Sequence, residues 1–102
     1  MAAVGRPWNE FETAYRTGLA AFLQAVERTD PKDEAAFKPI LKLAIGRFGV
    51  SVASLVERTG HSNSAISKWV NTASMPPQST REIVLKYIQL HLRHEYESTT
   101  AD

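Results

Sequence analysis

Apolar side chains return along this chain at every third or fourth residue, which is the period of one face of an α-helix. The pattern predicts five helices, over residues 7–29, 33–48, 51–59, 62–70 and from residue 79 onward. Strict alternation of apolar and polar residues, which predicts a strand, extends nowhere beyond about five positions. The expected fold class is therefore all-α, a five-helix bundle with a long N-terminal helix.

Proline and glycine mark the expected ends of three helices. Pro31 ends the first helix, because proline cannot continue the backbone hydrogen-bond ladder. Gly49 and Gly60 stand where the second and third helices end, a position that favours glycine. Pro39 falls inside the second range, so that helix either begins near Lys38 or is kinked at the proline.

Serine marks the starts of the last three helices. Ser51 and Ser62 are expected N-caps, since a serine hydroxyl accepts a hydrogen bond from a free backbone N–H of the first turn. Ser79 and Glu82 have the spacing of a capping box, in which the glutamate reaches back to the cap residue. The last helix is then expected to pack through Ile83, Val84, Tyr87, Ile88 and Leu92, or Leu90 on the neighbouring stripe.

The first predicted helix is about twice as long as an average helix in a globular protein. Its apolar residues are Phe11, Tyr15, Leu19, Phe22, Leu23 and Val26. Either this face packs entirely on the core of the chain, or part of it is left for a partner chain. We expect a dimer contact through the following residues, with help from Leu92 and Tyr96: Phe11, Tyr15, Leu19 and Phe22.

The composition is that of an ordinary globular protein of one domain. The chain has 102 residues, of which 43% are hydrophobic and 23% charged. The sequence has no apolar run of the ~18 residues that span a membrane, and its first ten residues lack the apolar core of a signal peptide. Cysteine is absent, which excludes disulfides and thiolate chemistry. We expect a cytoplasmic protein that is not inserted in a membrane.

The net charge of +1 hides an uneven distribution. Residues 35–81 carry one acidic residue, Glu57, against six basic residues: Lys38, Lys42, Arg47, Arg58, Lys68 and Arg81. The segments on both sides of this one are net acidic. A basic segment between acidic ends is typical of a chain that meets a polyanion, although a solvated basic face gives the same pattern.

Two short predicted helices around Gly60 form the most informative pattern. A helix, a glycine turn and a second helix with a polar outer face make a helix-turn-helix, in which the second helix enters the major groove of DNA. The polar residues of the second helix suit base edges, because Asn pairs with adenine, Lys with guanine and Ser with either. These candidate base contacts are Asn63, Ser64, Ser67 and Lys68. The alternative is an ordinary helical hairpin with a polar surface.

The same stretch carries a family pattern. The matching positions are Ser51, Leu55-Val56, Gly60-His61-Ser62, Ile66-Ser67-Lys68-Trp69 and Pro76. This pattern resembles the helix-turn-helix of the lambda-repressor-like, or XRE/Cro, family, over about residues 36–92 and without a gap. The resemblance implies DNA-phosphate contacts at Ser51, Ser62, Asn71 and Ser74, and a recognition-helix core of Ile66 and Trp69.

The sequence departs from the family pattern at two positions. Val52 stands where many members carry a Gln that contacts a phosphate. Thr72 occupies the usual glycine position of the following loop, so we expect Asn71 to adopt the left-handed conformation instead.

Enzymatic chemistry has no support in the sequence, and we expect a non-enzyme without cofactor or metal. His91, His94 and Glu95 share one side of the last helix, but a zinc site needs three or four ligands with supporting hydrogen bonds. The serines lie at caps and in loops, without a Gly-x-Ser-x-Gly elbow or a phosphate-binding glycine loop.

The expected organisation has three parts: an N-terminal helix over 1–32 as a candidate dimerisation arm, a helix-turn-helix DNA-binding domain over 33–97, and a frayed tail over 98–102. The expected function is sequence-specific binding of double-stranded DNA by a homodimer, as in a bacterial or phage transcriptional regulator, with the helix over 62–70 in the major groove. The alternative is a protein-interaction module, such as an antitoxin or adaptor, that binds a partner protein through its N-terminal helix.

Overall fold

The computed structural model describes residues 10–100 of the chain. These residues form five α-helices and no strand, which confirms the all-α fold class. The helices are α1 (Glu10–Arg28), α2 (Glu34–Arg47), α3 (Val52–Thr59), α4 (Asn63–Asn71) and α5 (Gln78–Thr100). Between the two chain ends, each predicted bound lies within one residue of the observed one. The expected start of the first helix lies outside the described residues.

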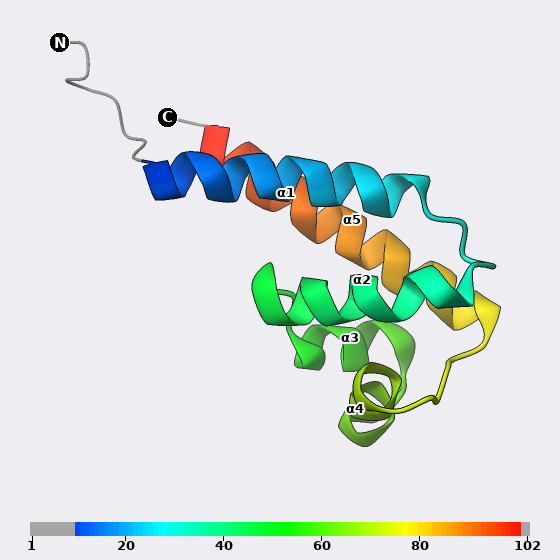
Figure 1. Cartoon of the computed structure of the whole chain (residues 1–102). Helices are drawn as coiled ribbons and strands as arrows, with labels where there is room; N and C mark the ends of the chain where they lie inside the picture. Colours follow the sequence, from blue (N-terminus) through cyan, green and yellow to red (C-terminus); the bar gives the residue numbers. More distant parts are fainter. Residues whose placement is uncertain (1–9, 101–102) are drawn as a thin grey trace, which may run out of the picture.

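The two long helices α1 and α5 lie side by side and run in opposite directions (Figure 1). The shorter helices α2, α3 and α4 pack beneath one half of this pair, and α4 lies on the side remote from α1. The far ends of α1 and α5 extend beyond the three short helices, so the molecule is elongated, at 53 × 24 × 20 Å.

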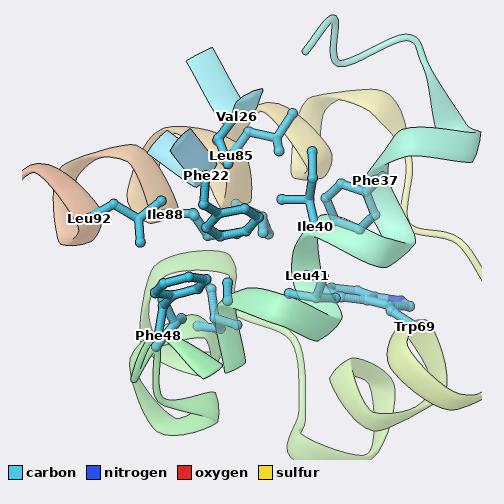
Figure 2. Close-up of a cluster of buried hydrophobic side chains, with 14 of the residues drawn as sticks. Phe22, Val26, Phe37, Ile40, Leu41, Phe48, Trp69, Leu85, Ile88 and Leu92 are labelled. Carbon is cyan, nitrogen blue, oxygen red and sulfur yellow. The ribbon is translucent and has the colours of Figure 1, made fainter. Parts of the chain in front are cut away.

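All five helices contribute to one hydrophobic core (Figure 2). Phe22 of α1 stacks on Phe48, which follows α2, with ring centroids 4.8 Å apart. Leu41 of α2 lies next to the indole of Trp69 from α4 (Figure 2). The buried apolar residues are Leu19, Phe22, Val26, Phe37, Ile40, Leu41, Ala44, Phe48, Val50, Leu55, Ile66, Trp69, Val84, Leu85, Ile88 and Leu92.

The long N-terminal helix is part of this core, which corrects the expected dimer contact. Leu19 and Phe22 are buried inside the chain, as is Leu92 of α5, so they have no surface left to offer a partner. Of the four residues expected at that contact, Phe11 and Tyr15 remain exposed, Phe11 to 84%. α1 therefore packs along α5 and does not extend away from it as an arm.

α2 begins before its proline. Asp33 is the N-cap, and its carboxylate accepts from the backbone N–H of Ala36 at 3.2 Å. The helix then continues through Pro39 to Arg47, so it does not begin near Lys38. Gly49 follows with a φ of 77°, the left-handed conformation that suits a glycine after a helix.

α5 begins at Gln78, one residue earlier than the sequence predicts, and the expected capping box does not form. Ser79 lies inside the helix, and the Glu82 carboxylate accepts from the side chain of Gln78 at 3.3 Å. The helix also extends to Thr100, beyond the expected end of the domain at residue 97.

The buried residues of α5 differ in part from the predicted set. Ile83 is 44% exposed, whereas Leu85 is buried together with Val84, Ile88 and Leu92. Arg81 lies on the same side of the helix as these buried residues, and its buried guanidinium donates to the carbonyls of Pro31 and Pro76, each at 2.7 Å. Leu90 is 53% exposed, so the alternative stripe is not used.

Candidate nucleic-acid interface

The turn between α3 and α4 consists of three residues, Gly60, His61 and Ser62. Gly60 has a φ of 76°, and its N–H donates to the carbonyl of Val56 at 2.9 Å. A Cβ at Gly60 would meet nothing within 4 Å, so the left-handed backbone alone requires glycine here. Thr59 fixes the turn further, because its hydroxyl accepts from the N–H of His61 at 3.1 Å.

Both predicted N-caps are confirmed. The Ser51 hydroxyl accepts from the N–H of Ser54 at 3.0 Å, and the Ser62 hydroxyl accepts from the N–H of Ala65 at 3.1 Å. The two serines lie at the starts of α3 and α4. Other N–H groups of each first turn have no partner inside their helix and suit an anion.

Five polar residues cover one continuous side of α4. With 3.6 residues in each turn, they span an arc of about 140° around the helix axis. We call this surface the polar arc; its members are Asn63, Ser64, Ser67, Lys68 and Asn71, and all are exposed. It contains the four candidate base contacts. Asn71, expected at a phosphate, lies on the same surface, and its side chain donates to the Ser67 hydroxyl at 3.3 Å.

The opposite side of α4 attaches the helix to the core. Ile66 is fully buried, and Trp69 nearly so. The His61 ring meets the indole of Trp69 edge to face, with centroids 5.0 Å apart, so the turn and the helix pack on each other. The nine residues of α4 thus expose a polar side to solvent, while the opposite side stays packed on the core.

The end of α4 differs from the sequence prediction. Asn71 is the last helical residue and does not adopt the left-handed conformation expected of it. Thr72 is extended instead, with φ −132° and ψ −176°, so the chain leaves the helix without needing a left-handed residue. Its hydroxyl donates to the carbonyl of Lys68 at 2.6 Å and accepts from the N–H of Ser74 at 3.1 Å. Ser74, a candidate phosphate contact, is exposed in the loop that follows.

Half of the basic residues in the central segment are used inside the chain. Arg81 is buried, Arg58 lies over the ring of Tyr87 at 4.8 Å from its centroid, and Lys38 contacts backbone carbonyls at the end of α4. The remaining three are exposed, and the described part of the chain offers them no hydrogen bond or ion pair: Lys42, Arg47 and Lys68. Of the six, Arg81 is buried and Lys38 half-buried, whereas Arg58 stays exposed, so the basic excess at the surface is smaller than the residue count predicts.

Sequence reasoning missed two residues beside this surface. The Ser54 hydroxyl accepts a hydrogen bond from the Ser51 hydroxyl at 2.8 Å. The hydrogen of the Ser54 hydroxyl can then be donated to another group at the start of α3. Lys38 is one of the six basic residues of the central segment, and its ammonium group lies on carbonyls of Trp69 and Thr72. The position of Ser54, three residues after an N-cap, is a usable signal, whereas nothing local to Lys38 predicts a contact 31 residues away.

His91 and Tyr15 lie outside the hairpin formed by α3 and α4. The His91 Nε2 lies 2.8 Å from the carbonyl oxygen of Phe48, at the end of α2. Within residues 10–100, no three His, Asp or Glu side chains gather as metal ligands. Burial, and then the nearby Glu95 carboxylate, raise the pKa of Tyr15 above its ordinary value of 10.0.

No helix within residues 10–100 is long and apolar enough to cross a membrane.

Comparison of the chain with protein-family models, curated proteins and solved structures finds no match.

Proposed function

We propose that this protein binds double-stranded DNA sequence-specifically, as a transcriptional regulator does, with α4 in the major groove. The observation that carries the proposal is the pairing of a three-residue glycine turn with the polar arc of α4. In a helix-turn-helix the second helix must present hydrogen-bonding side chains outward, while its other side stays packed on the first helix and the core. The resemblance to lambda-repressor-like proteins supports the same function.

The residues divide by the part of DNA that they suit. Asn63, Ser64, Ser67 and Lys68 are the proposed base contacts, since amide, hydroxyl and ammonium groups match the major-groove edges of the bases. The helix starts at Ser51 and Ser62 are proposed to receive phosphates. Asn71 and Ser74 are the proposed contacts at the other end of α4, to phosphate or to a base edge.

We propose that the DNA-bound form is a homodimer. A single module of this kind covers only ~600–1,000 Å² of its surface on DNA, and tight specific binding usually needs two. Phe11 and Tyr15 are the part of the expected contact that remains exposed on α1. A homodimer would select a two-fold symmetric site with half-sites about 34 Å apart, whereas a monomer would select one half-site.

The first test is a salt titration of binding to random-sequence duplex DNA, followed by fluorescence anisotropy. Affinity should fall linearly with salt on logarithmic axes, with a slope of about −0.9 for each phosphate neutralised. Three exposed cations of the central segment have no partner in the described residues: Lys42, Arg47 and Lys68. If each neutralises one phosphate of random DNA, the slope is about −2.7 for each chain. Absence of binding at ~50 mM salt, where such contacts are strongest, would reject the proposal.

The second test uses a duplex selected from a random library by the wild-type chain. Lys68→Ala should weaken binding to this duplex by about 1–3 kcal/mol and relax the selected sequence at one position, as expected for a base contact. Lys86→Ala, an exposed lysine of α5 outside the hairpin, is the matched control and should leave the selected sequence unchanged. Equal and small effects of both substitutions would show that Lys68 does not read a base.

The protein-interaction alternative has one specific observation in its favour. Phe11 exposes 84% of its surface at the start of α1, far from α4. On this reading the hairpin is a scaffold, and substitutions on the polar arc have no effect on activity. The titration with random DNA separates the two functions directly.

A further inference from the structure

The last turn of α4 and the loop after it are held by a cation from another helix. The ammonium group of Lys38, in α2, contacts the carbonyl oxygens of Trp69 and Thr72 and lies 3.4 Å from that of Ser74. The last carbonyls of a helix have no partner within the helix, and they carry partial negative charge. The carbonyl of Trp69 is one of these, whereas the carbonyls of Thr72 and Ser74 belong to the residues after the helix. An ammonium group with three N–H donors can serve all three acceptors.

A second cation holds the other end of the same loop. Arg81 donates to the carbonyl of Pro76 at 2.7 Å. The carbonyls of every second loop residue, Thr72, Ser74 and Pro76, therefore face two cations of the protein. This arrangement fixes the loop between α4 and α5 although it contains no helix or strand of its own.

Trp69 is the point at which two attachments of α4 meet. Its indole is buried in the core, and its backbone carbonyl accepts from Lys38. A rotation of α4 about its axis would have to move both. Lys68, the neighbouring residue, carries the only cation of the polar arc, so its position follows directly from that of Trp69.

We propose that Lys38 is a positioning residue for the proposed recognition helix. It holds the end of α4 and the loop at Ser74 in the orientation in which the polar arc meets the bases, and it does so without contacting DNA. The part of the proposal that concerns DNA rests on the proposed function; the part that concerns the orientation of α4 does not.

Lys42 provides a matched control on the same helix. It lies one turn after Lys38, carries the same charge and is exposed, and the described residues offer it no hydrogen-bond partner. Replacing either lysine with methionine removes one positive charge and keeps a long unbranched side chain. The two variants therefore differ in whether the carbonyls at the end of α4 lose their donor.

The experiment compares the wild-type chain with Lys38→Met and Lys42→Met in two measurements. Amide hydrogen exchange of the free protein should become about tenfold faster at residues 69–72 in Lys38→Met and stay unchanged along α1. Binding to the library-selected duplex should weaken about tenfold in Lys38→Met, against less than about threefold for a scrambled duplex. The salt slope should not change, because Lys38 neutralises no phosphate. Lys42→Met should leave the exchange rates and the ratio of the two affinities as in the wild type.

Each contrary result overturns a defined part of the proposal. Unchanged exchange at residues 69–72 in Lys38→Met would show that Lys38 does not hold α4, whatever the chain binds. Faster exchange with an unchanged ratio of affinities would reduce Lys38 to a purely structural role. If the wild-type chain selects no duplex, the proposed function fails, and the role of Lys38 toward DNA fails with it. If Lys38→Met does not fold, Lys38→Gln replaces it, because its shorter side chain keeps a polar group with at most two donors. The same changes in exchange and in the ratio of affinities are expected from it, to a smaller degree.

Discussion

The pair of long helices and the pair of short helices are built on different principles. α1 and α5 have 19 and 23 residues and bury a stripe of large apolar side chains against each other. α3 and α4 have eight and nine residues, a length at which an isolated helix is not stable in water. The short pair depends on its caps, on the glycine turn and on a few anchors such as Leu55 and Trp69.

The difference extends to the polar side chains. Along the long pair, several of them bind within the chain: Arg93 contacts Glu27 across the two helices, and the Arg16 guanidinium lies 4.8 Å from the centre of the Tyr96 ring. On α4 the polar arc is turned to solvent, and its one hydrogen bond among the described side chains joins Asn71 to Ser67. The long pair therefore supplies the stability that allows a short and otherwise weak hairpin to expose its polar residues.

The largest effect expected is that of Leu19→Ala. Leu19 is fully buried in α1, and its truncation should lower the free energy of unfolding by about 3 kcal/mol, within the range of buried Leu→Ala changes. Because α1 shares one core with α3 and α4, hydrogen exchange should show the same loss in the most protected amides of α1 and α3.

Gln24→Ala, on the exposed side of the same helix, is the control and should change the free energy of unfolding by less than about 0.5 kcal/mol. If Leu19→Ala accelerated exchange in α1 alone, α1 would be a separable arm after all. α1 would then not be coupled to the short hairpin through the shared core, and it would not contribute to the stability of the hairpin.

The short hairpin could be predicted from the sequence almost completely, because its signals are local. Ser51, Gly60 and Ser62 act through backbone groups within four residues of themselves. The same is true of the polar arc, which follows from helical periodicity once Ile66 and Trp69 are assigned to the core. Such local signals fix where the short helices begin and end, although the helices still need core anchors such as Leu55 and Trp69 to be stable.

The long pair was predicted less well, because its details depend on contacts that are distant in the sequence. The buried face of α5 includes Arg81, which donates to a carbonyl 50 residues away at Pro31. The burial of Leu19 and Phe22 follows from α5, and the sequence of α1 alone is equally compatible with a partner chain. The contact between the Lys38 ammonium group and the end of α4 also joins residues that are distant in the sequence, so the charge of Lys38 could not predict it.

The next largest effects are those expected from two glycine substitutions, one in the hairpin and one in the long pair. Gly60→Ala should destabilise the protein by about 1–2 kcal/mol, because alanine resists the left-handed backbone at φ 76°. Gly18→Ala, in the middle of α1, should stabilise it by about 0.5–1 kcal/mol, because alanine favours a helix interior. A Cβ meets nothing within 4 Å at either position, so packing does not enter either result.

Chemical denaturation of both variants gives the two values. The opposite signs would show that glycine is required by conformation in the hairpin and merely tolerated in the long pair. Destabilisation by Gly18→Ala would contradict this, since it would require a close approach to α1 that the structure does not contain.

The smallest expected effect concerns Tyr15, where α1 meets both Phe48 and the end of α5. Its pKa is raised above 10.0 by burial and, to a lesser extent, by Glu95, so the folded chain keeps the phenolic proton at a pH where the unfolded chain releases it. This contribution to stability is complete below pH 10 and is lost as the pH rises through the raised pKa. Urea denaturation from about pH 9 to about pH 11 should therefore show a steeper decline for the wild type than for Tyr15→Phe. Glu95→Gln should keep most of that decline, because burial is the larger cause of the raised pKa. Equal declines in stability for the wild type and Tyr15→Phe would show instead that the phenol is solvated in the folded chain.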